Sequence, residues 1–322
     1  MNKPLYIIGI EGGGTKTTAV LCALDGLILT EAQGGPSNFH IVGIEKTANT
    51  LLDLIQTCCH SVGCNVPQIG AVVAGLAGAG RVLDQQHILD RLLEVARTRN
   101  VSLEKVSIES DARIALEGAF SGKPGIVVIA GTGSIVFGKD EHERVYRAGG
   151  WGRLIGDEGS GYAIGRESFR AVAKMLDGHG DKTKLVKLFN EKFGLGSQDT
   201  IIEAIYSENY DLASVVPAVM EAASKGDPVA KKIFIRACSD LVDVIETVLM
   251  KMKKGKKSVP KRSLAFVGSL LMHDNFYSRK IRSAIKREVP LVSIRNAESS
   301  PVVGAALMAI RSLHEERGDK IF

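Results

Sequence analysis

A stretch of six residues near the N-terminus has the composition of an anion-binding turn. An apolar run leads into it, and in chain order its residues are Glu11, Gly12, Gly13, Gly14, Thr15 and Lys16. Because glycine has no Cβ, backbone N–H groups in such a turn can approach a ligand closely, and a nest of N–H groups binds anions. The composition predicts a phosphate-binding turn, in which Lys16 either offsets phosphate charge or points to solvent.

A second turn of the same kind stands in the other half of the chain. Gly131, Thr132 and Gly133 separate two apolar runs in "GIVVIAGTGSIVFG" (125–138). Either turn alone would be an ordinary hairpin more often than a ligand site. Two threonine-containing glycine turns, one in each half, favour phosphate binding by the mechanism of glycine loops.

The carboxylate of Asp111 stands where a strand ends and a helix begins, in "SIESDARIALEGA" (107–119). Aspartate at such a position commonly caps the helix. A carboxylate within hydrogen-bond reach of a hydroxyl can also accept its proton. The residues themselves leave both roles open.

Alternating strands and helices would position these residues. Apolar runs and helical periodicity predict strands at 5–10, 18–24, 27–31, 70–76 and 106–110, and helices at 45–62, near 84–98 and from 111 onward. The tight turns between the first three strands predict an antiparallel start to the sheet. The order βββαβαβ predicts an α/β fold, with a mixed sheet that carries helices on its faces.

The second half of the chain is more helical. Asp227 and Pro228 predict the N-cap and first turn of a helix that runs to about Met252. The basic run 251–262 is interpreted as a solvated loop, because no aromatic residue interleaves it as single-stranded nucleic acid binding would require. "SLAFVGSLL" (263–271) predicts an apolar strand ending on Gly-Ser, and the segment 299–316 predicts a helix with a face of small residues.

Composition limits the class of protein. A chain of 322 residues, 45% of them hydrophobic, is long enough for two globular domains. The net charge of +5 favours anionic ligands weakly and does not indicate nucleic acid. The five cysteines form no metal-type CxxC, and Cys58 and Cys59 fall on the apolar side of the 45–62 helix, so reduced thiols packed in a core are expected. Neither a signal peptide nor a membrane span is evident, so we expect a cytoplasmic protein with no membrane partner.

Five segments in a fixed order resemble the motifs of one superfamily. They are "GIEGGGTKT" (9–17), "IAGTGS" (129–134), "GGWGRLIGDEGSGYAIG" (149–165), "AFVGSLL" (265–271) and "SPVVGAALMA" (300–309). They resemble, respectively, the first and second phosphate loops, the sugar-binding signature, the adenosine loop and the connecting helix of sugar kinases in the actin/heat-shock chaperone/hexokinase superfamily. The chain is most similar to the N-acetylglucosamine kinase branch of the BadF/BadG/BcrA/BcrD-type ATPase family.

The resemblance implies a fold of two ribonuclease-H-like, actin-like ATPase lobes that face an interdomain cleft. Each lobe would contain a mixed sheet with the order βββαβαβ. Residues 1–118 with 301–322 would form one lobe, with the first phosphate loop, and residues 119–300 the other, with the second phosphate loop, the sugar loop and the adenosine loop. A homodimer is also expected.

The resemblance also implies a reaction, in which the γ-phosphate of ATP passes to the 6-hydroxyl of an amino sugar, N-acetylglucosamine first. Asp111 would be the catalytic base, and Glu11 would hold Mg²⁺ through water. The sugar-binding residues would be Asn38, Ser134, Gly150, Trp151, Gly152 and Asp157. The nucleotide-binding residues would be Gly12, Gly13, Gly14, Thr15, Lys16, Gly131, Thr132, Gly133, Ala222, Gly268 and Ser269. Trp151 could instead anchor a core.

Three departures from the family's pattern leave the sugar open. Ile135 stands where animal enzymes of this branch have asparagine, Ala148 where they have cysteine, and Ala222 where they have glycine near the adenine. Glucosamine, N-acetylmuramic acid and glucose therefore remain alternatives. An ATPase activator of 2-hydroxyacyl-CoA dehydratases is a less favoured alternative, because cluster ligation needs exposed thiolates. A sugar-responsive repressor would need a DNA-binding extension, and an actin-like filament or chaperone would not need the sugar loop.

Overall fold

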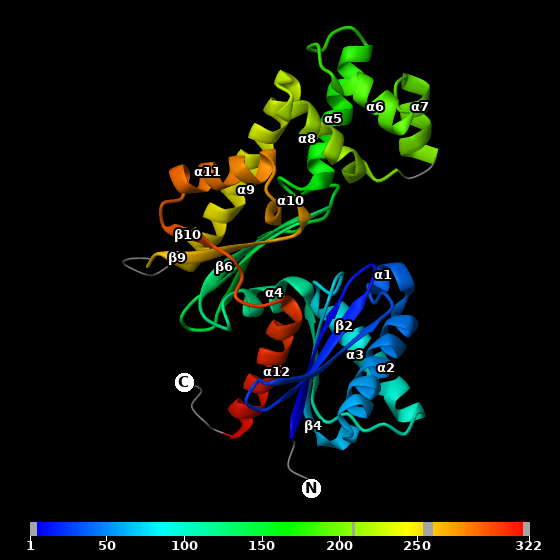
Figure 1. Cartoon of the computed structure of the whole chain (residues 1–322), viewed down its shortest axis with the longest axis vertical. Coiled ribbons are helices and arrows are strands. Elements are labelled where there is room, and N and C mark those ends of the chain that lie inside the picture. Colours follow the sequence, from blue (N-terminus) through cyan, green and yellow to red (C-terminus); the bar gives the residue numbers. More distant parts are fainter. Residues whose placement is uncertain (1–4, 208–209, 254–259, 318–322) are drawn as a thin grey trace. The chain divides into compact units, whose positions relative to one another are not determined.

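The computed structural model describes residues 5–207, 210–253 and 260–317, which form two compact units (Figure 1). The N-terminal unit comprises Met1–Pro124 and Asn296–Phe322, and the central unit comprises Gly125–Arg295. The sequence predicted one lobe of residues 1–118 with 301–322 and another of residues 119–300. These lobe boundaries stay a prediction. Each unit is described here by itself.

The N-terminal unit is built on a five-stranded mixed sheet with the strand order β3-β2-β1-β4-β5. Its strands are β1 (Tyr6–Gly12), β2 (Thr17–Ala23), β3 (Ile28–Gly34), β4 (Ile69–Leu76) and β5 (Val106–Ser110). The first three pair antiparallel, whereas β4 and β5 run parallel to β1. The predicted antiparallel start and the order βββαβαβ are confirmed.

Helices cover both faces of this sheet (Figure 1). They are α1 (Phe39–Val42), α2 (Ile44–Val62), α3 (Val82–Thr98), α4 (Asp111–Ala119), α12 (Pro301–Arg317) and the short η1 (Val66–Gln68). Side chains alternate across a strand, so Ile8 and Ile10 of β1 pack with α2 and α3, whereas Ile7 packs with α4 and α12. Cys58 and Cys59 are buried on the sheet side of α2, which confirms their predicted place in a core.

Small residues bring α12 close to the sheet and to α4. A Cβ on Gly9 would lie 2.4 Å from the backbone nitrogen of Ala306, and a Cβ on Gly118 would lie 2.4 Å from the carbonyl oxygen of Ser300. Only glycine fits where two backbones approach so closely. The N-terminus of α12 therefore lies beside the end of β1, where Glu11 stands.

The central unit repeats the topology of the first. Its sheet has the order β10-β9-β6-β7-β8, with β6, β7 and β8 antiparallel and β9 and β10 parallel to β6. The strands are β6 (Gly125–Ala130), β7 (Ser134–Lys139), β8 (Val145–Gly149), β9 (Arg262–Val267) and β10 (Val292–Arg295). In both sheets the third, second, first, fourth and fifth strands of the unit stand in that spatial order. The predicted α/β class, with two mixed sheets, is confirmed.

Most of the remaining chain of the central unit is helical. Its helices are α5 (Gly161–Leu176), α6 (Leu185–Phe193), α7 (Gln198–Ile202), η2 (Glu203–Ser207), η3 (Leu212–Val215), α8 (Val216–Ser224), α9 (Pro228–Lys253), α10 (Ser269–Met272) and α11 (Phe276–Glu288). The predicted cap of α9 is confirmed, because the Ala230 N–H donates to Asp227 Oδ1 over 2.9 Å. The strand predicted over 263–271 is too long, since β9 ends at Val267 and α10 follows. The loop predicted over 251–262 is too long at both ends, because Lys253 is the last residue of α9 and Arg262 the first of β9, and residues 254–259 lie outside the described residues.

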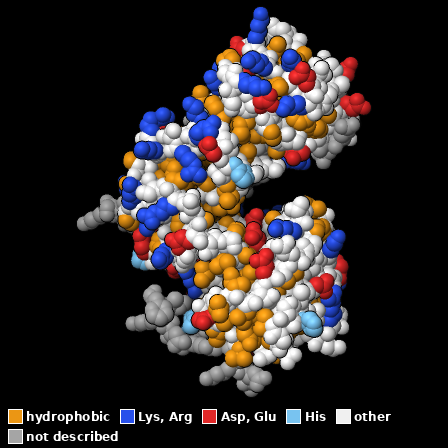
Figure 2. Space-filling view, viewed as in Figure 1, with side chains coloured by type: hydrophobic (Ala, Val, Ile, Leu, Met, Phe, Trp, Pro, Cys, Tyr) orange, Lys and Arg blue, Asp and Glu red, His pale blue; other side chains and the backbone are white. Residues whose placement is uncertain are grey.

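Charge is distributed unevenly between the units. Of the 41 Lys and Arg residues in the sequence, 28 lie in the central unit, against 20 of the 36 Asp and Glu residues. Basic side chains are accordingly frequent on the face of the central unit that Figure 2 shows. None of the helices in the described ranges is long and apolar enough to cross a bilayer.

Candidate active site

The β1–β2 turn contains the first predicted phosphate loop. The Gly13 N–H donates to the Lys16 carbonyl over 3.0 Å, which closes the turn, and Gly14, Thr15 and Lys16 are exposed. Only glycine fits at position 12 without a clash, because a Cβ there would lie 2.0 Å from Ser37 Oγ. The turn therefore presents its tip to solvent while its base is tightly packed.

A hydroxyl pair that the sequence analysis did not single out supports this turn from behind. The buried Thr17 hydroxyl lies 2.6 Å from the Gly35 carbonyl oxygen and 2.8 Å from Ser37 Oγ. The backbone N–H groups of Ser37 and Asn38 both donate to the Gly13 carbonyl. Asn38 is thereby held against the turn, and it also caps α1, because its Oδ1 accepts from the His40 N–H over 3.1 Å. The contact joins residues 20 positions apart, so no local pattern announces it.

Two carboxylates gather at the ends of the parallel strands of the N-terminal unit. The two carboxylates are those of Glu11 and Asp111. Glu11 on β1 stands opposite Gly75 on β4, and Gly75 stands opposite Glu109 on β5, two residues before Asp111. Burial, followed by repulsion from Asp111, raises the pKa of Glu11, against the opposing effects of Lys16 and a hydrogen bond from the Val302 N–H. The two predicted residues are therefore close enough to interact electrostatically.

Asp111 is not the cap of α4. Ser110 occupies the N-cap position, and its Oγ accepts from the Arg113 N–H over 3.2 Å. Asp111 follows as the first helical residue and is exposed to solvent on one side, although protein atoms surround the rest of its carboxylate. Burial among surrounding protein raises the pKa of Asp111, although hydrogen bonds from the Ala112 N–H and its own N–H oppose the shift. The capping role that the sequence left open belongs to Ser110, so capping does not account for Asp111.

A buried ion pair fixes α4, the helix of Asp111, to α12. The Glu117 side chain is fully buried, and Arg311 Nη1 of α12 lies 2.9 Å from its Oε2. Arg113, one turn earlier on α4, pairs with the other carboxylate oxygen. Since α12 also donates its Val302 N–H to Glu11, this cluster sets the position of both carboxylates.

In the central unit, the β6–β7 turn contains the second predicted phosphate loop and contacts the start of α5. The N–H groups of Gly161 and Tyr162 donate to the carbonyls of Gly131 and Thr132, over 2.8 and 3.0 Å. A Cβ on Gly133 would lie 3.0 Å from Asp157 Oδ2. The turn is therefore fixed by α5 and lies directly against the Asp157 carboxylate.

Asp157 is held in an unusual backbone conformation. Its φ is +61°, in the left-handed region that few non-glycine residues adopt, and its side chain is buried. Its carboxylate accepts hydrogen bonds from the N–H groups of Ser134 and Gly152, but burial dominates and raises the pKa of Asp157. The Tyr277 hydroxyl donates to the Gly159 carbonyl over 2.7 Å and so fixes the end of this loop.

The loop 150–156 places the remaining predicted sugar residues. Gly150 and Gly152 have φ values of +69° and +85°, and a Cβ on Gly150 would lie 2.4 Å from Ile135 Cδ1. Ile135 therefore forms an apolar floor beneath the loop. Trp151 is 68% exposed, so the alternative that it anchors a core is wrong. Ser134 is buried and its hydroxyl donates to the Glu158 carbonyl over 2.7 Å.

A cavity of about 430 Å³ adjoins the second glycine turn, entirely within the central unit. Gly131, Thr132 and Ser269 line it, together with residues that the sequence analysis did not single out: Asp211, Ser214, Pro217, Met220, His273 and Asn275. Gly268 shapes its edge, because its φ is +95° and a Cβ there would lie 2.4 Å from the Ala130 carbonyl oxygen. Ala222 is fully buried in the core and does not line the cavity, whereas Met220 of the same helix does.

Gly12→Ala should lower stability without any ligand present. The new methyl group would collide with Ser37 Oγ and with Leu76 Cδ2, at 2.0 and 2.5 Å, and overpacking of this kind costs about 1–3 kcal/mol. Gly13→Ala is the matched control, because its nearest neighbour is the Lys16 carbonyl oxygen at 3.5 Å. Urea unfolding of both variants measures the difference. Equal stability of the two would contradict the packing described for this turn.

The two α/β units, each with a glycine turn after its first strand, define a protein of duplicated topology with one such turn in each unit. A model of the BadF/BadG/BcrA/BcrD ATPase family matches residues 8–309, and the chain belongs to this family. The family predicted from the five motifs is thereby confirmed.

Two relatives match nearly the whole chain. The chain is 33% identical over 307 residues to the N-acetylmuramic acid/N-acetylglucosamine kinase of Clostridium acetobutylicum, with 94% of this chain and 98% of the relative covered. It is 31% identical over 326 residues to the N-acetyl-D-glucosamine kinase of Dictyostelium discoideum, with 97% and 99% covered. The fold is also that of a solved structure, a candidate N-acetylglucosamine kinase from Chromobacterium violaceum. That structure has a TM-score of 0.68 and 24% identity, and the match covers 95% of this chain and 98% of that chain.

Proposed function

We propose that the protein is an ATP-dependent amino-sugar kinase that phosphorylates the 6-hydroxyl of N-acetylglucosamine. The proposal rests on one observation: the second glycine turn adjoins a cavity on one side and a buried carboxylate on the other. Gly131 and Thr132 line the 430 Å³ cavity, while Gly133 lies against the buried Asp157 carboxylate. A nucleotide in the cavity would have its phosphates at the turn, next to a carboxylate suited to sugar hydroxyls. The names of the two relatives support an amino-sugar kinase, and the 6-hydroxyl is our own proposal.

The cavity has the mixed lining that a nucleotide needs. Pro217 and Met220 supply apolar surface for a base, and Asp211 and Asn275 supply polar groups. The N–H groups and the Thr132 hydroxyl of the second turn would bind the phosphates, and the first turn offers the same anion-binding chemistry. The roles assigned to Gly268 and Ser269 fit this arrangement, whereas Ala222 would act only through the packing of α8.

Asp157 would accept hydrogen bonds from two adjacent sugar hydroxyls. It is already oriented by the Ser134 and Gly152 N–H groups, so little side-chain freedom would be lost on binding. Asn38 and the backbone of Gly150 and Gly152 would complete the sugar site, with the exposed Trp151 ring available for contact. Ser134 would support Asp157 from below.

Asp111 would take the proton of the attacking hydroxyl. Phosphoryl transfer asks a protein mainly for positioning and charge stabilisation, and the Glu117–Arg311 pair supplies the positioning. Glu11 and Asp111 repel each other, as expected where a divalent cation binds between carboxylates and phosphates. Mg²⁺ held by Glu11 through water would supply charge neutralisation when bound. The expected homodimer stays a prediction.

The iron–sulfur alternative is disfavoured by the cysteines. Cys22, Cys58, Cys59 and Cys238 are buried, and burial raises the pKa of the Cys58 thiol to about 11 and that of Cys238 to about 12. A thiol with such a pKa is rarely a thiolate at neutral pH. Cluster ligation needs thiolates, so these four residues are poor ligands.

ADP release over a panel of sugars tests the proposal. The panel contains N-acetylglucosamine, N-acetylmuramic acid, glucosamine and glucose, each with ATP and Mg²⁺. We expect the highest kcat/KM with N-acetylglucosamine, because a substituent on the 3-hydroxyl of N-acetylmuramic acid removes a donor that Asp157 would use and adds a like charge. ADP release no faster with any sugar than with ATP alone would refute a sugar kinase.

A further inference from the structure

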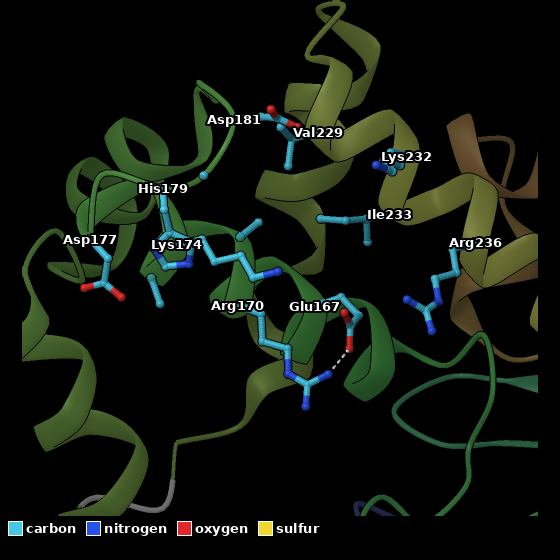
Figure 3. A pocket seen from close by; sticks show the side chains of 13 residues that line it. Glu167, Arg170, Lys174, Asp177, His179, Asp181, Val229, Lys232, Ile233 and Arg236 are labelled. Atoms are coloured by element: carbon cyan, nitrogen blue, oxygen red, sulfur yellow. Dashed lines mark hydrogen bonds and ion pairs between the residues drawn. The ribbon is translucent and has the colours of Figure 1, made fainter.

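A second cavity of the central unit lies on α5 and α9 and shares no lining residue with the nucleotide cavity. It is a groove of about 710 Å³ between the second half of α5 and the first turns of α9, closed at one end by residues 177–181 (Figure 3). Its volume falls in the range of small-molecule sites. Nothing in the proposed kinase reaction uses it.

Basic side chains from both helices face this groove. Lys174 comes from α5, and Lys232 and Arg236 come from α9, with the apolar Ile233 between them (Figure 3). These three cations form no salt bridge with any carboxylate of the described residues, whereas their neighbour Arg170 pairs with Glu167 at 2.8 Å. Three cations from two facing helices therefore line one groove, where they would attract a group with two negative charges.

The closed end of the groove has the opposite character. Asp177 ends α5, the chain turns at Gly178 with a φ of +80°, and Asp181 follows. The N–H groups of His179 and Gly180 both donate to the Lys174 carbonyl, which fixes this turn beside the basic residues. Carboxylates here can accept hydrogen bonds from hydroxyl groups. The groove therefore offers cations for an anionic group and, within the same lining, carboxylates for hydroxyl groups, with Lys174 next to Asp177 and Glu167 on the side of Arg236.

We propose that this groove binds a sugar phosphate at a site separate from the catalytic one. The phosphate would lie between Lys174, Lys232 and Arg236, and the sugar hydroxyls would bind Asp177 and Asp181. Inorganic phosphate shares the anionic chemistry but lacks the hydroxyls, so it would bind more weakly. The binding site goes beyond the kinase function and does not depend on it, whereas the effect on kinetics described next rests on the proposed function.

The groove also adjoins the loop of Asp157. A small cavity of about 60 Å³ shares Glu167, Ile233 and Arg236 with the groove and extends to Gly159, two residues after Asp157. A ligand that engages Arg236 therefore acts on side chains packed beneath this loop. Occupancy of the groove should change the KM for the sugar substrate, with a smaller effect on the KM for ATP.

Calorimetric titration of the nucleotide-free protein with N-acetylglucosamine 6-phosphate tests the site. Lys232→Met and Arg236→Met should each weaken binding about tenfold, since each removes a charge-assisted hydrogen bond. Lys286→Met, which removes an exposed charge from α11, is the matched control and should leave affinity unchanged. Because a product could also occupy the catalytic site, Asp157→Asn is titrated in parallel and should still bind.

Four outcomes would overturn the proposal. They are the absence of saturable binding, equal weakening by Lys286→Met and the groove variants, loss of binding in Asp157→Asn alone, and binding of inorganic phosphate as tight as that of the sugar phosphate. A failure of the kinase proposal gives a different pattern, namely no ADP release with any sugar and intact groove binding.

Discussion

Asp111→Asn should lower the turnover number by roughly two to four orders of magnitude, the usual contribution of a positioned general base. Asparagine keeps the size of the side chain but cannot accept the proton. Stability should be unchanged or higher. Burial raises the folded-state pKa of Asp111, so its contribution to stability is present below the unfolded pKa and is lost as the pH rises through the folded pKa. Because Asp111 is also exposed to water, this effect is screened and the stability of Asp111→Asn should stay close to that of the wild type.

Asp84→Asn is the matched control for this variant. Asp84 is also a first-turn carboxylate of a helix in the same unit, paired with Arg81 at 2.6 Å. Its loss should reduce stability by at most about 1 kcal/mol and leave turnover unchanged. Kinetics and thermal melts of both variants decide the matter. Wild-type turnover in Asp111→Asn would remove Asp111 from the mechanism.

Asp157→Asn should lower kcat/KM for the sugar by about 10²- to 10⁴-fold, and the KM for ATP should change little. Two hydrogen bonds from sugar hydroxyls to a charged acceptor would be weakened, and each contributes about 1.5–3 kcal/mol. Asparagine tolerates the left-handed conformation at this position, where φ is +61°, so the loop should keep its shape. The measurement is steady-state kinetics with either substrate varied.

Asp199→Asn provides the comparison, because Asp199 is an exposed carboxylate of the same unit on α7. It should behave as wild type. If Asp157→Asn raised the KM for ATP and spared the sugar, the assignment of this loop to the sugar would be wrong. Melting temperatures of both variants separate a binding effect from unfolding.

The sequence was most informative where function depends on local chain geometry. Glycine turns, strand ends and the cap at Asp227 depend on neighbouring residues, so the first five strands and the helices between them lie within a few residues of their predicted positions. β8, only five residues long with exposed outward side chains, has no such local signal and was not predicted. Asp111 could be placed at a strand end, but the identity of the cap required the structure, because Ser110 and Asp111 are adjacent and both are good caps.

Contacts between distant segments could not be read from the sequence. The pairing of Thr17 with Ser37, the Glu117–Arg311 pair and the packing of Ile135 against Gly150 each depend on how elements dock. The same reason accounts for Ala222. A residue on a helix of the central unit faces either the core or the cavity according to the rotation of that helix, and on α8 it is Met220 that faces the cavity.

The most direct test of the central claim is nuclear magnetic resonance of the product formed from N-acetylglucosamine, ATP and Mg²⁺. We predict one phosphomonoester, with its phosphorus coupled to the protons on carbon 6, formed in equal amount to ADP. Release of inorganic phosphate with the sugar unchanged, or a phosphate on the anomeric carbon, would contradict the claim.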